Sequence, residues 1–335
     1  TFTVEDQTLT YGDGATISPS ISKVSGLTYT ITGTFNNSNF TGSLVIPTNT
    51  SVGTYTATFT VTVSDSYGLS ESTTKSITVK IDKKALTVTL APSSTQTTYG
   101  TSTIFTLTFS GFANSETASV LNGTLNSTNS TNSLSGNVYT ITTDPTLAVG
   151  DYTIKVSGLS SNNYSFDLSK LSSTLTVGKK GITINPNDVT YVYNGLAQSL
   201  PAFNGGTPNY TITAGGLVSG HTITYVSYTG SRTEVGSNSI MVDTLTIING
   251  KTNVTENYEL TSDPGTITID PASLTVQVMV GGSASNTITY GDENPELSVN
   301  YIGFVNNETE SVLGGALKLN CSTLTLSSNQ ISGYP

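Results

Sequence analysis

The stretch TYTATFTVTVS (54–64) decides the fold class. Apolar side chains occupy every second position from Tyr55 to Val63, and hydroxyl side chains fill the positions between them. Because successive side chains of a β-strand point to opposite faces, this period of two predicts a strand with one buried face. No stretch shows apolar residues at helical spacing, so the predicted fold is all-β. Similar alternation occurs in KSITVKI (75–81), ALTVTL (85–90), DYTIKVS (151–157), STLTVGK (173–179) and TITIDPASLTVQVMV (266–280).

The composition limits the compartment and the partners. Only 10% of the 335 residues are charged, against about 25% in an average soluble domain. The formal net charge of -10 offers no basic face, so nucleic acid is not expected as a partner. A single cysteine excludes a disulfide within the chain, which fits an exported bacterial surface protein. No apolar run approaches the ~18 residues of a membrane-spanning helix, so no membrane insertion is expected within this segment.

Internal repetition sets the domain organisation. A Tyr-Gly or Tyr-Asn-Gly turn recurs with steps of 88, 94 and 97 residues, at Tyr11, Tyr99, Tyr193 and Tyr290. The segments GFANSETASVLNG (111–123) and GFVNNETESVLGG (303–315) match at nine of thirteen positions and lie 192 residues apart, which is two unit lengths. Units of about 90 residues with several short strands have the size of a two-sheet sandwich. The predicted domains are 1–83, 84–179, 180–271 and an incomplete 272–335.

These motifs together carry a resemblance to a known family. The Tyr-Gly turn, the GFxNxExxSVLxG segment, VGDY (149–152), SNNY (161–164) and the closing TLTV resemble the MBG repeat of bacterial surface proteins. The third unit is a variant, and the first is similar to cadherin-like or Ig-like modules. The resemblance implies Ig-like β-sandwiches in a tandem, elongated array on a cell-surface adhesin. It also implies an extracellular, surface-attached location.

A Gly-x-Tyr element precedes or opens a late strand in three units. Tyrosines at this position of a sandwich commonly bond back to the backbone, which predicts a tyrosine corner at Tyr55 and Tyr152. Near the chain end, Gly333 and Tyr334 occupy the corresponding position without an intervening residue. The third unit has Asn238 there instead, so its corner is left open.

The turn at Tyr290 is the one place that looks like a cation site, since Asp292 and Glu293 follow it. Calcium needs six to eight oxygen ligands, and two of the four turns have no carboxylate after the glycine. We therefore interpret the turn as structural, because glycine tolerates the positive φ of a tight turn. No metal or cofactor site is predicted.

Catalytic motifs were not found, so no catalytic residue is predicted and the chain is expected not to be an enzyme. His221 is the sole histidine, and a loop or strand-start position is expected for it. Cys321 is in phase with Leu317 and Leu319, which predicts a small inward core residue.

Three further groups have structural interpretations. The lysine pairs at 83–84 and 179–180 are expected to be solvated hinge residues. Tyr191 and Tyr193 are expected on one buried or edge face of a strand rather than on a sugar-stacking platform. Lys155 lies at an alternating polar position, so it is expected to face solvent rather than form an isopeptide cross-link. Sequons occur at Asn36, Asn39, Asn122, Asn126, Asn129 and Asn253 among others, at a frequency close to chance.

Two hypotheses for function remain open from the sequence, and the ligand-binding residues are unknown. The first is a non-catalytic stalk or spacer that presents a distal binding region of an adhesin-like protein. The second is an adhesin module that binds a host glycan or protein through a domain face or loop tips; like chains in a surface filament are another possible partner. The short joints predict a rod. The fourth unit, counted from Leu274 to Pro335, has only 62 residues, which predicts a fragment that ends inside a domain.

Overall fold

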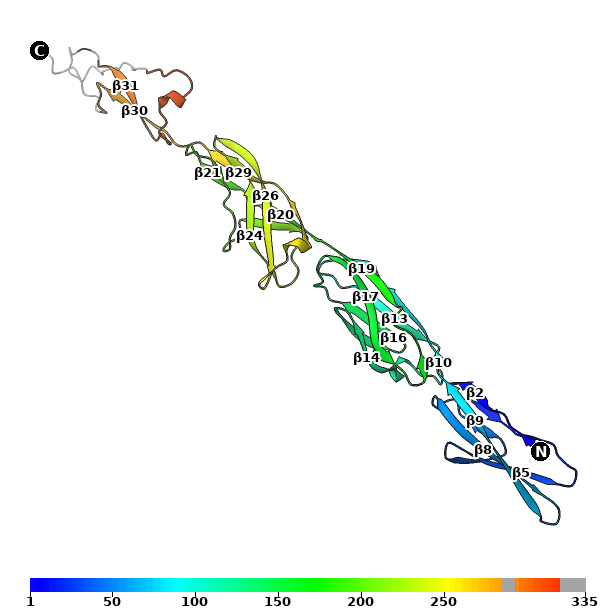
Figure 1. Cartoon of the computed structure of the whole chain (residues 1–335). Coiled ribbons are helices and arrows are strands. Elements are labelled where there is room, and N and C mark those ends of the chain that lie inside the picture. Colours follow the sequence, from blue (N-terminus) through cyan, green and yellow to red (C-terminus); the bar gives the residue numbers. More distant parts are fainter. Residues whose placement is uncertain (285–292, 294, 320–335) are drawn as a thin grey trace, which may run out of the picture. The chain divides into compact units, whose positions relative to one another are not determined.

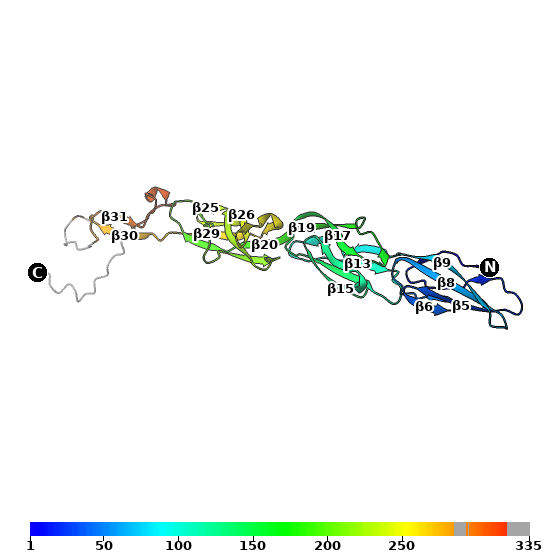
Figure 2. The same cartoon turned by 60° about the horizontal axis from the view of Figure 1, so that its bottom comes forward.

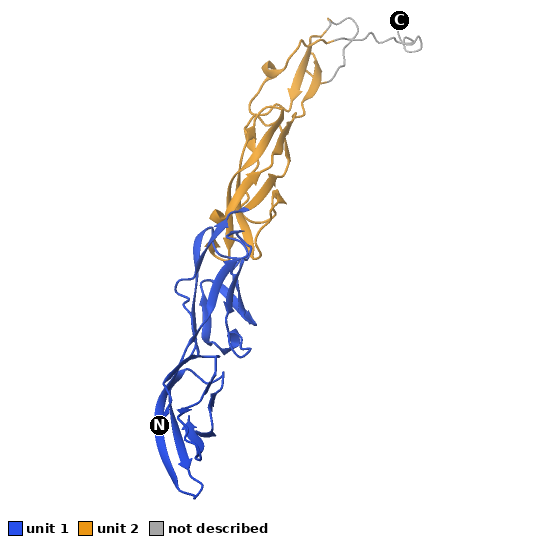
Figure 3. Ribbon diagram, turned by 90° about the vertical axis from the view of Figure 1, so that its right-hand side faces the viewer, with its two compact units in different colours: residues 1–180 blue, residues 181–335 orange. Residues whose placement is uncertain are grey.

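The computed structural model describes residues 1–284, 293 and 295–319. The prediction of an all-β fold is confirmed, because the only helical segments in these residues are three 3-10 turns, at Ala118–Val120, Thr255–Asn257 and Glu310–Val312. The chain divides into two compact units, residues 1–180 and 181–335 (Figure 3).

The first sandwich of the first unit is built from nine strands. Its main sheet has the order β2-β9-β8-β5-β6, and the pairs β1-β4 and β3-β7 complete it (Figures 1 and 2). Phe59 and Val79 of the main sheet are fully buried, and Ile46 of β7 is buried. The strands are β1 (Phe2–Thr3), β2 (Gln7–Thr10), β3 (Ala15–Ile17), β4 (Ser20–Ile21), β5 (Thr28–Phe35), β6 (Ser38–Thr41), β7 (Leu44–Ile46), β8 (Gly53–Ser64) and β9 (Ser70–Asp82).

The second sandwich, in the same unit, has two four-stranded sheets with the orders β11-β13-β16-β15 and β12-β19-β17-β14. Phe105, Leu107 and Ile141 of one sheet and Leu175 of the other are fully buried between them. The strands are β10 (Lys84–Ala85), β11 (Thr87–Pro92), β12 (Gln96–Thr98), β13 (Ile104–Ser110), β14 (Asn122–Ser127), β15 (Ser130–Ser135), β16 (Val138–Thr143), β17 (Gly150–Ser160), β18 (Tyr164–Ser165) and β19 (Ser172–Gly178).

The second unit holds the third sandwich and the described part of a fourth. The third has the sheets β23-β20-β28 and β21-β29-β26-β24, and the fourth contributes the hairpin β30-β31. The strands are β20 (Lys180–Pro186), β21 (Val189–Val192), β22 (Gln198–Ser199), β23 (Tyr210–Ala214), β24 (His221–Thr229), β25 (Ser231–Arg232), β26 (Gly236–Asn249), β27 (Thr252–Asn253), β28 (Tyr258–Ser262), β29 (Gly265–Asp270), β30 (Thr275–Val280) and β31 (Leu297–Ile302).

The same strand pairing places each of the three described Tyr-Gly turns at an end of its sandwich. A short strand pairs in parallel with the last strand of the sandwich: β2 with β9, β12 with β19 and β21 with β29. The tyrosine that follows extends this ladder, because the N–H groups of Tyr11, Tyr99 and Tyr193 donate to carbonyls 2.9, 2.9 and 2.8 Å away on the last strand or directly after it. The turn is therefore fixed where the chain leaves the sandwich.

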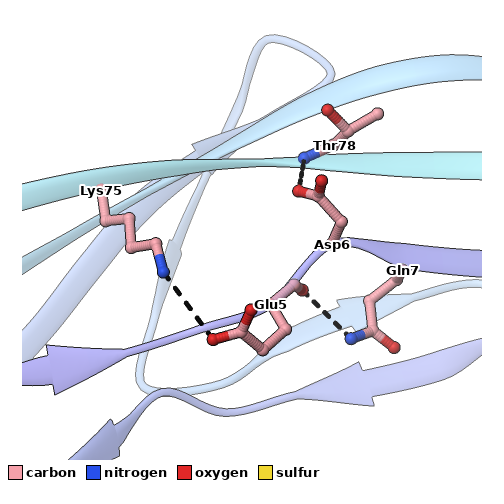
Figure 4. A network of polar contacts seen from close by, with 5 residues as sticks. All are labelled: Glu5, Asp6, Gln7, Lys75 and Thr78. Atoms are coloured by element: carbon pink, nitrogen blue, oxygen red, sulfur yellow. Dashed lines mark hydrogen bonds and ion pairs between the residues drawn. The ribbon is translucent and has the colours of Figure 1, made fainter.

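A carboxylate secures the start of this short strand. In the first sandwich, Asp6 accepts a hydrogen bond from the Thr78 N–H at 2.7 Å, and Glu5 lies 3.8 Å from the Lys75 ammonium (Figure 4). In the third sandwich, Asp188 accepts from the Thr266 N–H at 2.8 Å. Both carboxylates satisfy a backbone donor of the last strand.

The tyrosine corners predicted from Gly-x-Tyr are confirmed. The Tyr55 hydroxyl donates to the Ser51 carbonyl and the Tyr152 hydroxyl to the Ala148 carbonyl, both at 2.8 Å. In the third sandwich, Asn238 donates to the Ser231 carbonyl at 2.9 Å and accepts from Arg232 at 3.0 Å, so a side-chain amide and a guanidinium fill this role. Tyr334 lies outside the described residues.

Candidate functional site

The sequence-predicted candidates do not come together into one site. Asp292 and Cys321 lie outside the described residues, and Glu293 is exposed. His221 begins β24, as predicted, and is 8% exposed. Lys155 of β17 is exposed, as predicted. Within the described residues, no group of three or more His, Cys, Asp or Glu side chains could hold a metal ion.

The prediction for the lysine pairs needs correction at the first joint. Lys83 is exposed, but its ammonium donates to the Ser161 carbonyl of the second sandwich at 2.6 Å. Lys84 is half-buried in β10, which pairs in parallel with β18. These lysines therefore tie the two sandwiches of the first unit together and are not free hinge residues.

The tyrosine prediction is confirmed. Tyr191 lies on the edge strand β21 and Tyr193 follows it, and both pack, partly buried, against the apolar cluster of the third sandwich. Tyr193 has a second role at a joint, described below.

The contact that joins the first two sandwiches is built around one carboxylate. The Tyr11 hydroxyl, from the first sandwich, donates to Glu116 Oε1 at 2.8 Å. The Tyr164 hydroxyl, from the second sandwich, donates to Glu116 Oε2. Both tyrosines are 2% exposed and Glu116 is half-buried, so the two hydroxyls are shielded from water and the carboxylate is shielded in part. Because a carboxylate accepts at both oxygens, Glu116 satisfies two buried hydroxyls at once.

Ring packing and a further hydrogen bond fix the triad. The rings of Tyr11 and Tyr164 meet edge to face with centroids 5.3 Å apart, and Phe112 packs edge to face on Tyr164 at 5.0 Å. The Tyr164 hydroxyl also accepts the N–H of Ala113 at 2.9 Å. Aromatic pairs in this geometry stabilise beyond the area that they bury.

Gly12 allows the two sandwiches to approach closely. Its φ is +97°, and a Cβ at this position would lie 2.3 Å from the Cβ of Ala113. Its N–H donates to the Thr48 carbonyl at 3.1 Å, and the Asn114 amide donates to the same carbonyl at 3.2 Å. Only glycine satisfies both the backbone conformation and the space.

The second unit repeats this joint between the third sandwich and the described part of the fourth. The Tyr193 hydroxyl donates to Glu308 Oε1 at 2.5 Å, and the Asn306 amide donates to the Gly195 carbonyl at 3.2 Å. A Cβ on Gly195 would lie 2.3 Å from that of Asn306. The acceptor segments, residues 111–116 and 303–308, also share their backbone, with φ of 52° and 59° at 114–115 and at 306–307. The tyrosine–glutamate half of the joint is therefore present twice in the described residues.

The third sandwich carries a variant acceptor segment at 216–221. Its Val218 N–H donates to the Tyr258 hydroxyl at 3.0 Å, as Ala113 does to Tyr164. His221 stands in the place of Glu116, with Nδ1 2.7 Å from the Tyr258 hydroxyl. The same framework thus holds an imidazole in place of a carboxylate.

Burial and hydrogen bonds to carboxylates shift the pKa values of the tyrosines at the joints, and burial shifts that of His221. Burial, then the hydrogen bond to Glu116, raises the pKa of Tyr164 to about 12, and the same two causes raise the pKa of Tyr11. The hydrogen bond to Glu308 and then burial raise the pKa of Tyr193 to about 12. Burial lowers the pKa of His221. The tyrosines therefore stay protonated, and able to donate, at neutral pH.

Sequence reasoning missed Glu116 and Glu308. Both were visible as the invariant glutamate of GFANSE and GFVNNE, but repetition alone does not say what a residue contacts. Their tyrosine partners, Tyr11 and Tyr193, lie 105 and 115 residues earlier in the chain, in the preceding sandwich. The sequence signal for this contact was that the Tyr-Gly turn and the glutamate recur together.

The comparisons with known proteins agree with this architecture. The MBG domain of the YGX type matches residues 86–176 and 278–333. No curated protein matches the sequence. Within the described residues, no helix is long and apolar enough to cross a membrane.

Three solved structures are among those to which this chain is similar. An I-band fragment of titin is 14% identical over 80% of this chain and 96% of that chain, with a TM-score of 0.29. Extracellular cadherin domains 3–6 of protocadherin gamma B2 are 14% identical over 82% and 75%, with a TM-score of 0.24. SGBP-B of Bacteroides ovatus, in complex with a mixed-linkage heptasaccharide, is 14% identical over 81% and 67%, with a TM-score of 0.18.

The family match covers the second sandwich and much of the fourth repeat. Each of these supplies one of the glutamate acceptor segments. The Tyr-Gly turns that bond to these glutamates come from the preceding sandwiches. Residues 86–176 and 278–333 therefore match the MBG domain of the YGX type, in a chain whose described part is built of tandem β-sandwiches.

Proposed function

We propose that this chain is a non-catalytic spacer of a bacterial cell-surface adhesin-like protein that presents a distal binding region, and that neighbouring sandwiches within each unit are locked together. The observation that carries the proposal is the Tyr11–Glu116–Tyr164 triad, in which a half-buried carboxylate accepts from two buried tyrosine hydroxyls. A spacer needs joints that resist bending, and a joint resists bending when it buries hydrogen-bonded groups that water cannot replace.

The connection between the first two sandwiches supports the same role. One residue, Lys83, separates β9 from β10, and the Lys84 N–H donates to the Asn163 carbonyl at 3.0 Å. Together with the bond from Lys83 to Ser161, these contacts leave little free chain at the joint. The hydrogen bond from Tyr193 to Glu308 repeats the first half of the triad at a second joint. Such repetition is expected of a spacer, because each of its joints must resist bending.

Hydrogen–deuterium exchange on the full chain tests the proposal. Glu116→Ala leaves two hydroxyls without their acceptor, so we expect faster exchange at the Gly12 amide and in residues 48–52 and 111–116, with the cores of both sandwiches unchanged. Glu71→Ala, at an exposed position of β9, is the matched control and should change nothing at the joint. If Glu116→Ala exchanges like the control, the joint is not locked by the triad and the spacer proposal loses its support.

A screen of the full chain against glycoside, peptide and ester substrates tests the non-catalytic part. We expect no turnover above that of a heat-unfolded sample. Turnover that survives further purification would contradict a pure spacer.

A further inference from the structure

The first sandwich carries a groove that plays no part in the joint triad. Its volume is about 410 Å³, and it lies against β6, β7 and the chain between β7 and β8. Phe35, Phe40 and Tyr55 supply aromatic surface, and Asn36, Asn39 and Asn49 supply side-chain amides. None of the described side chains that line it carries a charge.

The aromatic part of the groove is held in place by packing. Phe40 meets Phe59 of the core edge to face, with centroids 5.0 Å apart. Phe35 and Tyr55 pack at 5.4 Å, and the corner bond from Tyr55 to the Ser51 carbonyl fixes the tyrosine ring. A ligand would therefore meet a preformed surface, which lowers the entropy lost on binding.

The polar part of the groove is free to bind. Asn36 and Asn37 form the two-residue turn between β5 and β6, with φ of 47° and 63°, and Asn39 follows on β6. Asn36, Asn39 and Asn49 are exposed, and within the described residues their side chains form no hydrogen bond. Each amide offers both donors and an acceptor, which is what a sugar hydroxyl requires from its partners.

The second sandwich holds one wall of this groove. The Thr48 carbonyl, between lining residues Pro47 and Asn49, accepts from the Gly12 N–H and from the Asn114 amide of the second sandwich. The Val52 N–H, beyond Ser51, donates to Asn163 Oδ1 of the second sandwich at 3.2 Å. The joint thus restrains the segment that forms the wall.

We propose that this groove binds a neutral carbohydrate, and that the joint with the second sandwich orders its wall for binding. A pyranose presents an apolar C–H face to aromatic rings and hydroxyls to amides, which matches the aromatic floor and the amide rim. The absence of lining charges in this described part of the chain favours a neutral sugar over a sialylated or uronic one. The volume lies within the ~300–1,000 Å³ typical of small-molecule sites. The site goes beyond the spacer role and does not depend on it.

The test begins with the full chain on an array of neutral gluco-, galacto- and manno-oligosaccharides, with sialylated and uronic oligosaccharides beside them. Calorimetry then measures the affinity for the neutral oligosaccharide with the strongest signal. We expect Asn39→Ala and Asn49→Ala each to weaken binding about 3- to 10-fold, since each removes hydrogen bonds. Ser38→Tyr, which fills the groove, should abolish binding. Asn204→Ala, at an exposed position of the third sandwich, is the control and should bind as the native chain does.

Several outcomes would overturn the proposal. No neutral oligosaccharide bound at millimolar concentration, a preference for acidic sugars, or native affinity in the Asn39 and Asn49 variants would each rule out this site. Thermal unfolding of every variant separates lost binding from lost folding.

A separate variant tests the ordering by the joint. Asn163→Ala leaves the groove lining intact but removes the acceptor of the Val52 N–H, so we expect about 3-fold weaker binding. Native affinity in this variant would show that the second sandwich does not order the wall. The spacer proposal stands or falls with Glu116→Ala exchange and not with any of these affinities.

Discussion

Glu116 and His221 show how one position changes the chemistry of an acceptor segment. The backbone bond to a tyrosine hydroxyl is the same in both segments, from Ala113 to Tyr164 and from Val218 to Tyr258. A carboxylate accepts two hydroxyl protons and carries a charge at neutral pH, whereas a neutral imidazole accepts one proton and carries none. The third sandwich therefore holds a segment whose charge changes in the mildly acidic range.

This difference predicts how the third sandwich responds to pH. Burial lowers the pKa of His221 in the folded chain, so the unfolded chain binds a proton first as the pH falls. Stability is therefore full above the unfolded pKa of about 6.5 and decreases as the pH falls below it. Because His221 is the sole histidine, its ring proton resonances in NMR report the titration directly, and we expect a midpoint below that of an unfolded peptide.

His221→Gln is the control for this response, because it keeps a polar side chain and removes the titration. Its unfolding midpoint should change less between pH 7.5 and pH 5.5 than that of the native chain. An NMR midpoint at or above the peptide value would contradict the role given to burial.

At the scale of single elements, the bounds of a strand were predictable from the sequence where one face of the strand packs on the core, because burial imposes the alternation of apolar and polar residues. The predicted strand at 54–64 is β8, Gly53–Ser64, with Ala57, Phe59 and Val61 buried. The next strand was predicted at 75–81, but β9 begins at Ser70. The segment SESTT has no apolar alternation because this arm of the hairpin reaches past the core. Hydroxyl pairs hold it instead, such as Thr60 with Thr74 at 3.1 Å and Thr62 with Ser72 at 2.8 Å.

The Tyr-Gly turn was predicted as a structural element, and its partner was not. Glycine was assigned from its tolerance of positive φ, and Gly12 has φ of +97°. Its second requirement, the contact with Ala113, joins residues about a hundred positions apart, and only the folded chain brings them together. The conformational preference of glycine thus predicted the positive φ of Gly12, whereas its role in the joint depends on a tertiary contact that the sequence does not show.

Two glycine substitutions separate these requirements. Gly12→Ala and Gly26→Ala both place a side chain at positive φ, which costs about 1–2 kcal/mol. A Cβ on Gly26 meets no atom within 4 Å, but a Cβ on Gly12 would overlap Ala113. We therefore expect only Gly12→Ala to open the joint, seen as faster proteolysis within residues 48–52 and 111–116. Equal protease sensitivity in the two variants would show that the close approach of Gly12 is not required.

At the scale of the whole molecule, each of the first three sandwiches has its own buried core, and the two glutamate joints each add a small hydrogen-bonded contact between neighbours within one unit. Only tyrosines belong both to a core and to a glutamate joint. Tyr164 is part of the core of the second sandwich, and Tyr193 packs against the core of the third. The first joint involves Tyr11, Glu116 and Tyr164, and the second involves Tyr193 and Glu308. Since sites that share no partner usually contribute additively, the two joints should behave as independent repeats of one device.

The double variant tests this independence in the intact chain. We expect Glu308→Ala to raise hydrogen exchange near Gly195 and in residues 303–308, and to leave the Gly12 amide and residues 48–52 unchanged. Glu116→Ala should do the reverse, and the double variant should show both changes at the magnitudes of the single ones, because each removed carboxylate leaves only its own tyrosine hydroxyls unpaired. If loosening one joint also speeds exchange at the other, the sandwiches transmit strain along the chain, and the joints act together rather than one by one.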